Sequence, residues 1–228
     1  MARKIKIDNA ELKRRTRQET RRKVGGRTER KYHLIVCEGE KTEPNYFLAW
    51  KRKLPRGVVE YIEIEGKGAN TLSLVGQAER IRSRKEAARG RSFDFTWAVF
   101  DRDSFPSDHF DNAIHKCEQL KPPIRSIWSN EAFELWFLLH LEFVNTGMKR
   151  EDYKSRIEQW LSSRMGIPFS YEKNRADMYE ILQRYGNEAQ AIKWAQQLEA
   201  SHTGSRFSSH NPCTKVHLLI GELNKLIQ

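Results

Sequence analysis

Short apolar runs alternate with amphipathic segments along the first part of the chain. The runs that favour strands, because β-branched and aromatic residues dominate them, are residues 32–37, 58–64, 93–103 and 124–129. Between them, apolar residues recur every three or four positions, as expected of helices, over residues 46–50, 72–81 and 107–120. This alternation predicts a parallel sheet flanked by helices, with right-handed crossovers.

The pattern becomes helical after residue 130. Helical periodicity covers residues 131–141, 151–165, 177–185, 187–200 and 214–227. Residues 133–139 are apolar nearly all round, which predicts a helix buried against the sheet. We therefore expect an α/β core over residues 31–145 and a mainly α-helical C-terminal part, residues 146–228, packed on that core.

Positive charge is concentrated at the start of the chain. The formal net charge is +11, and residues 1–31 hold thirteen Lys and Arg against four Asp and Glu. Residues 1–30 are poor in apolar side chains, so we expect a flexible basic arm that binds the phosphates of a nucleic acid. A solvated tail without a partner is the alternative, and a membrane is disfavoured because little in the arm could insert. The candidate phosphate contacts are Arg14, Arg15, Arg21, Arg22 and Lys23.

The sequence contains neither an apolar run long enough to cross a bilayer nor the apolar centre of a signal peptide. We therefore expect a cytoplasmic protein without membrane attachment. Its three cysteines, Cys37, Cys117 and Cys213, are odd in number and widely spaced, so they do not predict a disulfide framework.

Acidic residues follow two of the predicted strands. Asp101 and Asp103 are two positions apart, so in extended backbone both carboxylates leave the same face. Such a pair favours a divalent cation, Mg²⁺ or Mn²⁺, although capping of a turn by the two aspartates is the alternative. Glu38 follows the first strand, and ligands gather where parallel strands end. We expect Glu38 to meet the aspartates at one edge of the sheet.

These acids also carry a resemblance to known proteins. Glu38-Gly39 after a first strand and Asp101-Arg102-Asp103 after a later one resemble the toprim domain of topoisomerases, primases, recombination nucleases and overcoming-lysogenization-defect nucleases. Over about residues 31–226, the chain is more closely similar to the RloB family, also called AbiLii. The motifs that carry this likeness are residues 36–47 (VCEGEKTEPNYF), Ser129-Asn130 with residues 133–140 (FELWFLLH), and residues 211–216 (NPCTKV). One departure is Glu131, where the family leads us to expect proline; either residue suits the first turn of a helix.

The resemblance implies a Mg²⁺-dependent domain that cleaves phosphodiester bonds and acts in abortive infection against phage. It also implies a partner ATPase of the SMC/ABC type, encoded next door. In such a domain Asp101 and Asp103 hold a metal, and Glu38 is a third ligand or the general acid/base. A second metal would draw on Glu40, Glu43 or Glu134, and Lys41 would contact the phosphate. The substrate is left open between DNA and RNA, tRNA included.

Two other functions fit the same residues. The acids, Glu134 in particular, could be structural carboxylates in a module that binds nucleic acid or a partner without catalysis. Alternatively, the strand ends could form the nucleotide site of a sensor. Magnesium-independent binding would indicate the first, and stabilisation by nucleotides the second.

Overall fold

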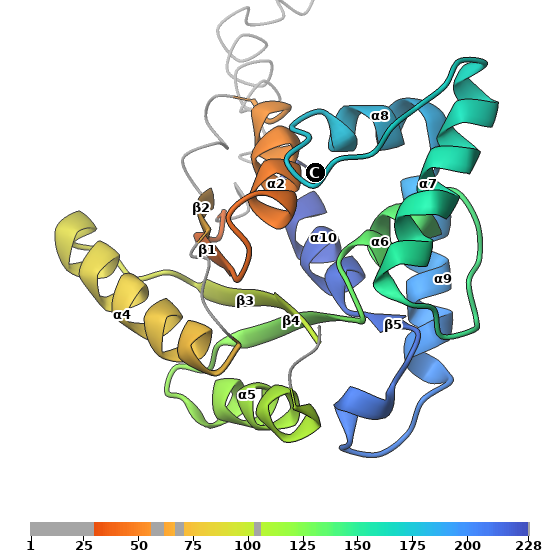
Figure 1. Cartoon of the computed structure of the whole chain (residues 1–228). Helices are drawn as coiled ribbons and strands as arrows, with labels where there is room; N and C mark the ends of the chain where they lie inside the picture. Colours follow the sequence, from red (N-terminus) through yellow and green to blue (C-terminus); the bar gives the residue numbers. More distant parts are fainter. Residues whose placement is uncertain (1–29, 56–61, 67–70, 103–105, 228) are drawn as a thin grey trace, which may run out of the picture.

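A five-stranded sheet forms the centre of the molecule (Figure 1), in a computed structural model that describes residues 30–55, 62–66, 71–102 and 106–227. Its strands are β1 (His33–Cys37), β2 (Ile62–Gly66), β3 (Phe95–Asp101), β4 (Arg125–Asn130) and β5 (Cys213–Thr214). Their order across the sheet is β2-β1-β3-β4-β5. The first four strands in this order run parallel, and β5 is antiparallel to β4. The α/β class predicted from the sequence is confirmed.

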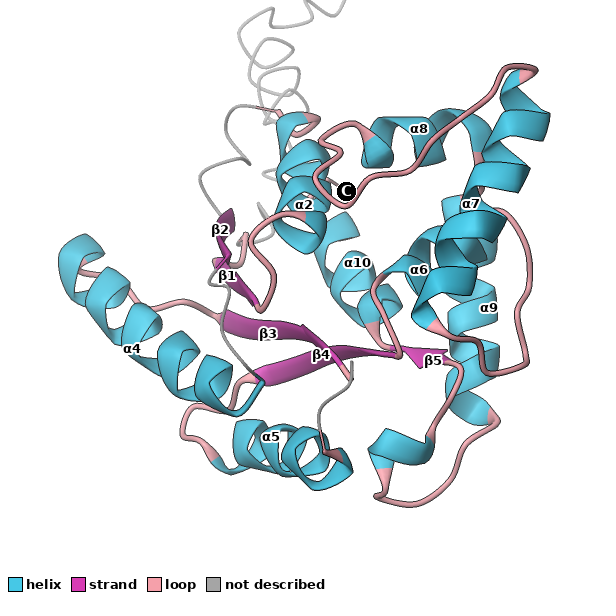
Figure 2. Cartoon of the chain, viewed as in Figure 1, coloured by secondary structure: helices cyan, strands magenta, loops and turns pink. Residues whose placement is uncertain are grey.

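Both faces of the sheet are apolar and covered by helices (Figure 2). Leu34 and Val36 of β1 belong to the core formed with α4 (Thr71–Arg89) and α5 (Ser107–Gln119). Their sequence neighbours Ile35 and Cys37 belong to the core on the other face. That face is covered by α2 (Thr42–Arg52), α6 (Glu134–Leu139) and α10 (Val216–Asn224). Alternate residues of a strand point to opposite faces, so a strand buried on both sides must be apolar throughout.

Three further helices follow α6 in the chain. They are α7 (Arg150–Met165), α8 (Met178–Tyr185) and α9 (Glu188–Ala200), with a 3₁₀ turn at Phe207–Ser209. α7 and α9 pack on α6, and α8 packs on α2. All six residues of α6 are buried, which confirms the buried helix predicted over this segment.

β5 is the main departure from the sequence prediction. The helix expected from residue 214 begins at Val216 and ends at Asn224, and Thr214 instead pairs with Ser129 of β4. The two side-chain hydroxyls also lie 2.9 Å apart in the buried interior. A strand of two residues is too short to produce an alternating pattern, so no periodicity indicated it.

Other differences concern element boundaries. The helix expected from residue 131 begins at Glu134, so Glu131 does not occupy its first turn as expected. The second strand, expected over residues 58–64, is observed at Ile62–Gly66, and residues 56–61 lie outside the described part. The basic arm, apart from Arg30, also lies outside it.

The described helices contain no segment with the length and apolar content needed to span a membrane. The three cysteines are free and buried, which agrees with the prediction that they form no disulfide framework.

Candidate active site

Glu38 and Asp101 meet where β1 and β3 end. The backbone amide of Glu38 donates to the Val99 carbonyl at 2.8 Å, which continues the pairing of the two parallel strands. The backbone amide of Asp101 in turn donates to Oε2 of Glu38 at 3.2 Å. The fold thus brings together two of the three acids predicted to hold a metal. Asp103, the third, lies outside the described residues.

Glu43 is buried beside the turn that follows β1. It lies in the first turn of α2, and its side chain packs against Gly39. A Cβ atom at position 39 would lie 2.3 Å from Oε2 of Glu43, so any other residue here would displace the buried Glu43 carboxylate. Burial and the neighbouring Glu134 and Glu38 raise the pKa of Glu43 to about 7, although backbone amides of Glu43 and Gly39 oppose the shift.

Glu134 enters the site from the start of α6 and is also buried. The Tyr171 hydroxyl donates to its Oε1 at 2.9 Å. Tyr171 belongs to the segment between α7 and α8, which crosses the start of α2: Thr42 Oγ1 donates to the Lys173 carbonyl at 3.1 Å. Burial and the Glu134 carboxylate raise the pKa of Tyr171, so its hydroxyl stays a hydrogen-bond donor.

Asp101 is buried and forms an ion pair. It is only 6% exposed, and its Oδ2 forms an ion pair with Nη2 of Arg150 at 3.1 Å. Its Oδ1 is buried and makes no hydrogen bond of standard geometry to any described residue. Burial, Glu43 and Glu134 raise the pKa of Asp101 well above its usual range, while Arg150 and the nearby amide of Phe133 act in the opposite direction.

Two residues of the turn after β1 lie at the surface, unlike the buried acids. Glu40 and Lys41 are exposed, and Lys41 directly precedes α2. Lys41 can therefore reach a phosphate at the surface of the site, as a point charge on a flexible side chain. Glu40 is the least enclosed of the acids considered for a second metal.

The donor chemistry of the site fits a hard divalent cation. Carboxylates suit Mg²⁺ or Mn²⁺, and the buried Oδ1 of Asp101 offers a coordination position. Among the residues that the structure describes, however, no group of three or more His, Cys, Asp or Glu side chains is arranged to hold a metal. Glu38 and Asp101 would hold an ion together with Asp103, and the roles predicted for all three stay predictions.

Sequence reasoning missed Arg150 and Tyr171. Arg150 lies 49 residues after its partner Asp101, and Tyr171 lies 37 residues after Glu134. At these separations along the sequence, the arginine and the tyrosine form no local motif with their partners. Only the packing of α7 and of the segment that follows it brings them to the acids.

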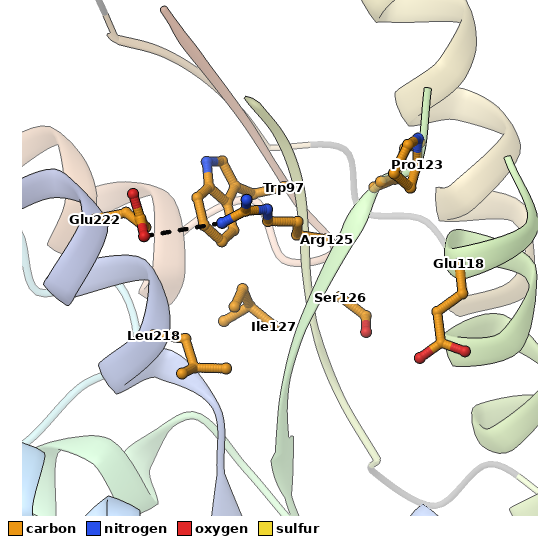
Figure 3. Close-up of a pocket in the computed structure, with 9 residues that line it drawn as sticks. Trp97, Glu118, Pro123, Arg125, Ser126, Ile127, Leu218 and Glu222 are labelled. Carbon is orange, nitrogen blue, oxygen red and sulfur yellow. Dashed lines mark ion pairs between the residues drawn. The ribbon is translucent and has the colours of Figure 1, made fainter. Parts of the chain in front are cut away.

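A separate pocket of about 510 Å³ lies at the other end of the strands (Figure 3). Trp97, Ile127 and Leu218 line it, and Arg125 pairs with Glu222 at its side, 4.0 Å apart. Because Arg125 begins β4 whereas Asp101 ends the parallel β3, this pocket is not part of the acidic site.

Comparison with models of protein families shows which family the chain matches. The model described as RloB-like protein matches residues 33–223, which is most of the sequence. The chain belongs to the RloB-like family. Neither a curated protein nor a solved structure matches it significantly. The matched region of this RloB-like chain contains Glu38, Glu43, Asp101 and Glu134, and it excludes the basic arm.

Replacing Glu43 by glutamine should stabilise the metal-free protein. At pH 8 the Glu43 carboxyl is ionised, above its folded pKa of about 7, beside Glu134 and Glu38. An isosteric neutral amide removes this repulsion, so we expect the melting temperature to rise by about 5 °C. The gain should shrink as the pH falls from 7 to 4.5, because the wild-type carboxyl is then protonated in the fold. Thermal unfolding in EDTA across this pH range measures the effect.

The matched control is Glu40→Gln, which neutralises an exposed carboxylate in the same turn. It should change the melting temperature by less than about 1 °C. Added Mg²⁺ should stabilise the wild type more than Glu43→Gln. An equal response of both proteins to Mg²⁺ would remove Glu43 from the predicted ligands.

Proposed function

We propose that this RloB-like chain is a Mg²⁺- or Mn²⁺-dependent nuclease that hydrolyses phosphodiester bonds in DNA or RNA, as the effector of an abortive-infection system against phage. The observation that carries the proposal is the meeting of Glu38 and Asp101 at the strand ends, joined by a 3.2 Å hydrogen bond. The buried carboxylates of Glu43 and Glu134 lie close enough to raise the pKa of Asp101. Like charges held together in this way favour the binding of a cation.

The residues of the site would have different roles in hydrolysis. Asp101 and Glu38, with Asp103, would hold a divalent metal, and Glu43 and Glu134 would contribute to a second. Bound there, the metal supplies Lewis-acid activation of the phosphate and of the attacking water. Glu38 is only partly buried, so its carboxylate can accept the proton of a water molecule that enters from the surface.

Other residues support substrate binding. Lys41 contacts the phosphate from the exposed rim. The chemistry of these residues addresses phosphate rather than sugar, so DNA and RNA, tRNA included, are both substrates to test. The basic arm adds affinity for the polyanion, and an ATPase of the SMC/ABC type is the proposed partner.

A cleavage assay tests the proposal. The purified full-length chain is incubated with plasmid DNA and with total RNA, in Mg²⁺, in Mn²⁺ or in EDTA. We expect cleavage of at least one polymer that needs the metal and stops in EDTA. Absence of cleavage under every condition, or cleavage that EDTA does not affect, would overturn the metal-dependent mechanism.

A non-catalytic binding module is the second candidate. Two contacts favour it: Arg150 neutralises Asp101, and Tyr171 donates to Glu134, so protein groups alone satisfy part of the acidic cluster. In that case nucleic-acid binding would be independent of magnesium and would survive loss of the acids.

A further inference from the structure

The ion pair between Arg150 and Asp101 joins a partly exposed cation to a buried carboxylate. The Arg150 side chain is 29% exposed, whereas that of Asp101 is 8% exposed and follows a buried strand. Arg150 therefore lies nearer to solvent than its partner, and if the pair opens we expect Arg150 to move.

The position of Arg150 at the start of α7 does not favour a positively charged side chain. Arg150 is the first residue of the helix, where the helix dipole favours negative side chains, and Glu151 and Asp152 follow it. A cation at this end gains nothing from the helix dipole. The Asp101 carboxylate, 3.1 Å away, is a favourable partner for it.

One guanidinium neutralises only part of the acidic cluster. Glu43 and Glu134 lie close enough to Asp101 to disfavour its charge, and Glu38 binds the Asp101 backbone. A divalent ion carries twice the charge of Arg150 and accepts more than one carboxylate oxygen. The buried Oδ1 of Asp101, which makes no standard hydrogen bond to a described residue, gives such an ion a first coordination position.

We propose that Arg150 is an internal cation that a divalent metal displaces from Asp101, and that the displaced guanidinium then binds the substrate phosphate. This inference rests on the proposed nuclease function, because it concerns the same site. The planar fork of an arginine matches the oxygens of a phosphate, and Arg150 starts beside the carboxylate that the metal would occupy. Metal binding thereby prepares the site for substrate.

The exchange predicts opposite effects of Arg150→Ala on metal and on substrate. Without its competitor, Mn²⁺ alone should bind about tenfold tighter, measured from the signal of free Mn²⁺ in electron paramagnetic resonance titrations. In the cleavage assay the KM for nucleic acid should rise about tenfold with kcat changed less, because a phosphate contact is lost. General damage to the fold would weaken both kinds of binding.

Two further variants complete the experiment. Arg156→Ala removes another α7 arginine from its ion pair, with Glu142, and should leave the Mn²⁺ affinity and the KM unchanged. Arg150→Lys keeps a positive charge without the planar fork. It should bind Mn²⁺ nearly as weakly as the wild type while its KM stays raised. If Arg150→Ala does not fold, Arg150→Gln takes its place, because glutamine also lacks the positive charge and the same changes in Mn²⁺ affinity and KM are expected.

The outcomes separate this inference from the proposed function. Unchanged or weaker Mn²⁺ binding by Arg150→Ala overturns the exchange, even where the wild type cleaves nucleic acid and the nuclease proposal stands. An unchanged KM overturns the phosphate contact. Tighter Mn²⁺ binding by the variant, in a protein whose wild type cleaves nothing, supports displacement at Asp101 and overturns the nuclease proposal.

Discussion

Asp101→Asn should lower metal-dependent cleavage by about 10³-fold or more while the protein stays folded. Asparagine fills the same buried space at the end of β3 but supplies no negative charge to a metal. It also relieves the repulsion that Asp101 experiences from Glu43 and Glu134, so we expect no large loss of thermal stability. Single-turnover cleavage rates in Mg²⁺, measured beside thermal unfolding in EDTA, test both parts. Asp101→Ala and Asp103→Ala should abolish cleavage in the same assay.

The matched control for this substitution is Asp108→Asn. Asp108 is exposed in the first turn of α5, so its neutralisation should leave the cleavage rate within about twofold of the wild type. Cleavage retained by Asp101→Asn in Mg²⁺ would refute a metal role for this residue. If the binding-module alternative holds, nucleic-acid affinity will be the same in the wild type and in Asp101→Asn, and neither protein will cleave.

The strands and the layers of helices on them could be predicted because a strand that is buried on both faces must be apolar along its length. Leu34 and Ile35 face opposite sides of the sheet and are both buried, so β1 has to be apolar without alternation. The same reasoning identified β3, whose residues from Thr96 to Asp101 are all buried. β5 escaped prediction because its pairing with β4 depends on where the chain returns after α9, and two residues contain no periodic signal.

The site was only partly predictable for a similar reason. Strand topology brings Glu38 to Asp101, and topology follows from the order of the elements along the chain. Burial of Glu43 could not be predicted with the same means, since a glutamate in the first turn of a helix is ordinarily exposed. Arg150 and Tyr171 reach the acids through packing of distant segments, which a single sequence does not encode as a local pattern.

Removing the positive charge of the arm should weaken nucleic-acid binding without changing the chemistry. The variant replaces Arg14, Arg15, Arg21, Arg22 and Lys23 by alanine in the full-length chain. Each phosphate contact releases counterions on binding, so losing five of them should reduce the slope of log affinity against log salt concentration by about 4. Affinity at low salt should fall by about 10²-fold or more. Fluorescence anisotropy with labelled DNA and RNA across a salt series measures both quantities.

The control for the arm removes charge from the folded surface. Arg80 and Arg84 are exposed on α4, and replacing both by alanine should alter the salt slope by less than about 2. Because Glu38, Glu43, Asp101 and Glu134 lie in the described fold and not in the arm, the arm variant should keep the kcat of the wild type at saturating substrate and bind Mn²⁺ with the same affinity. An unchanged salt slope would show that the arm does not contact phosphates. A large fall in kcat at full Mn²⁺ occupancy would instead show that the arm takes part in catalysis. That result would contradict the proposal that the arm only binds nucleic acid and that the acids at the strand ends perform the chemistry.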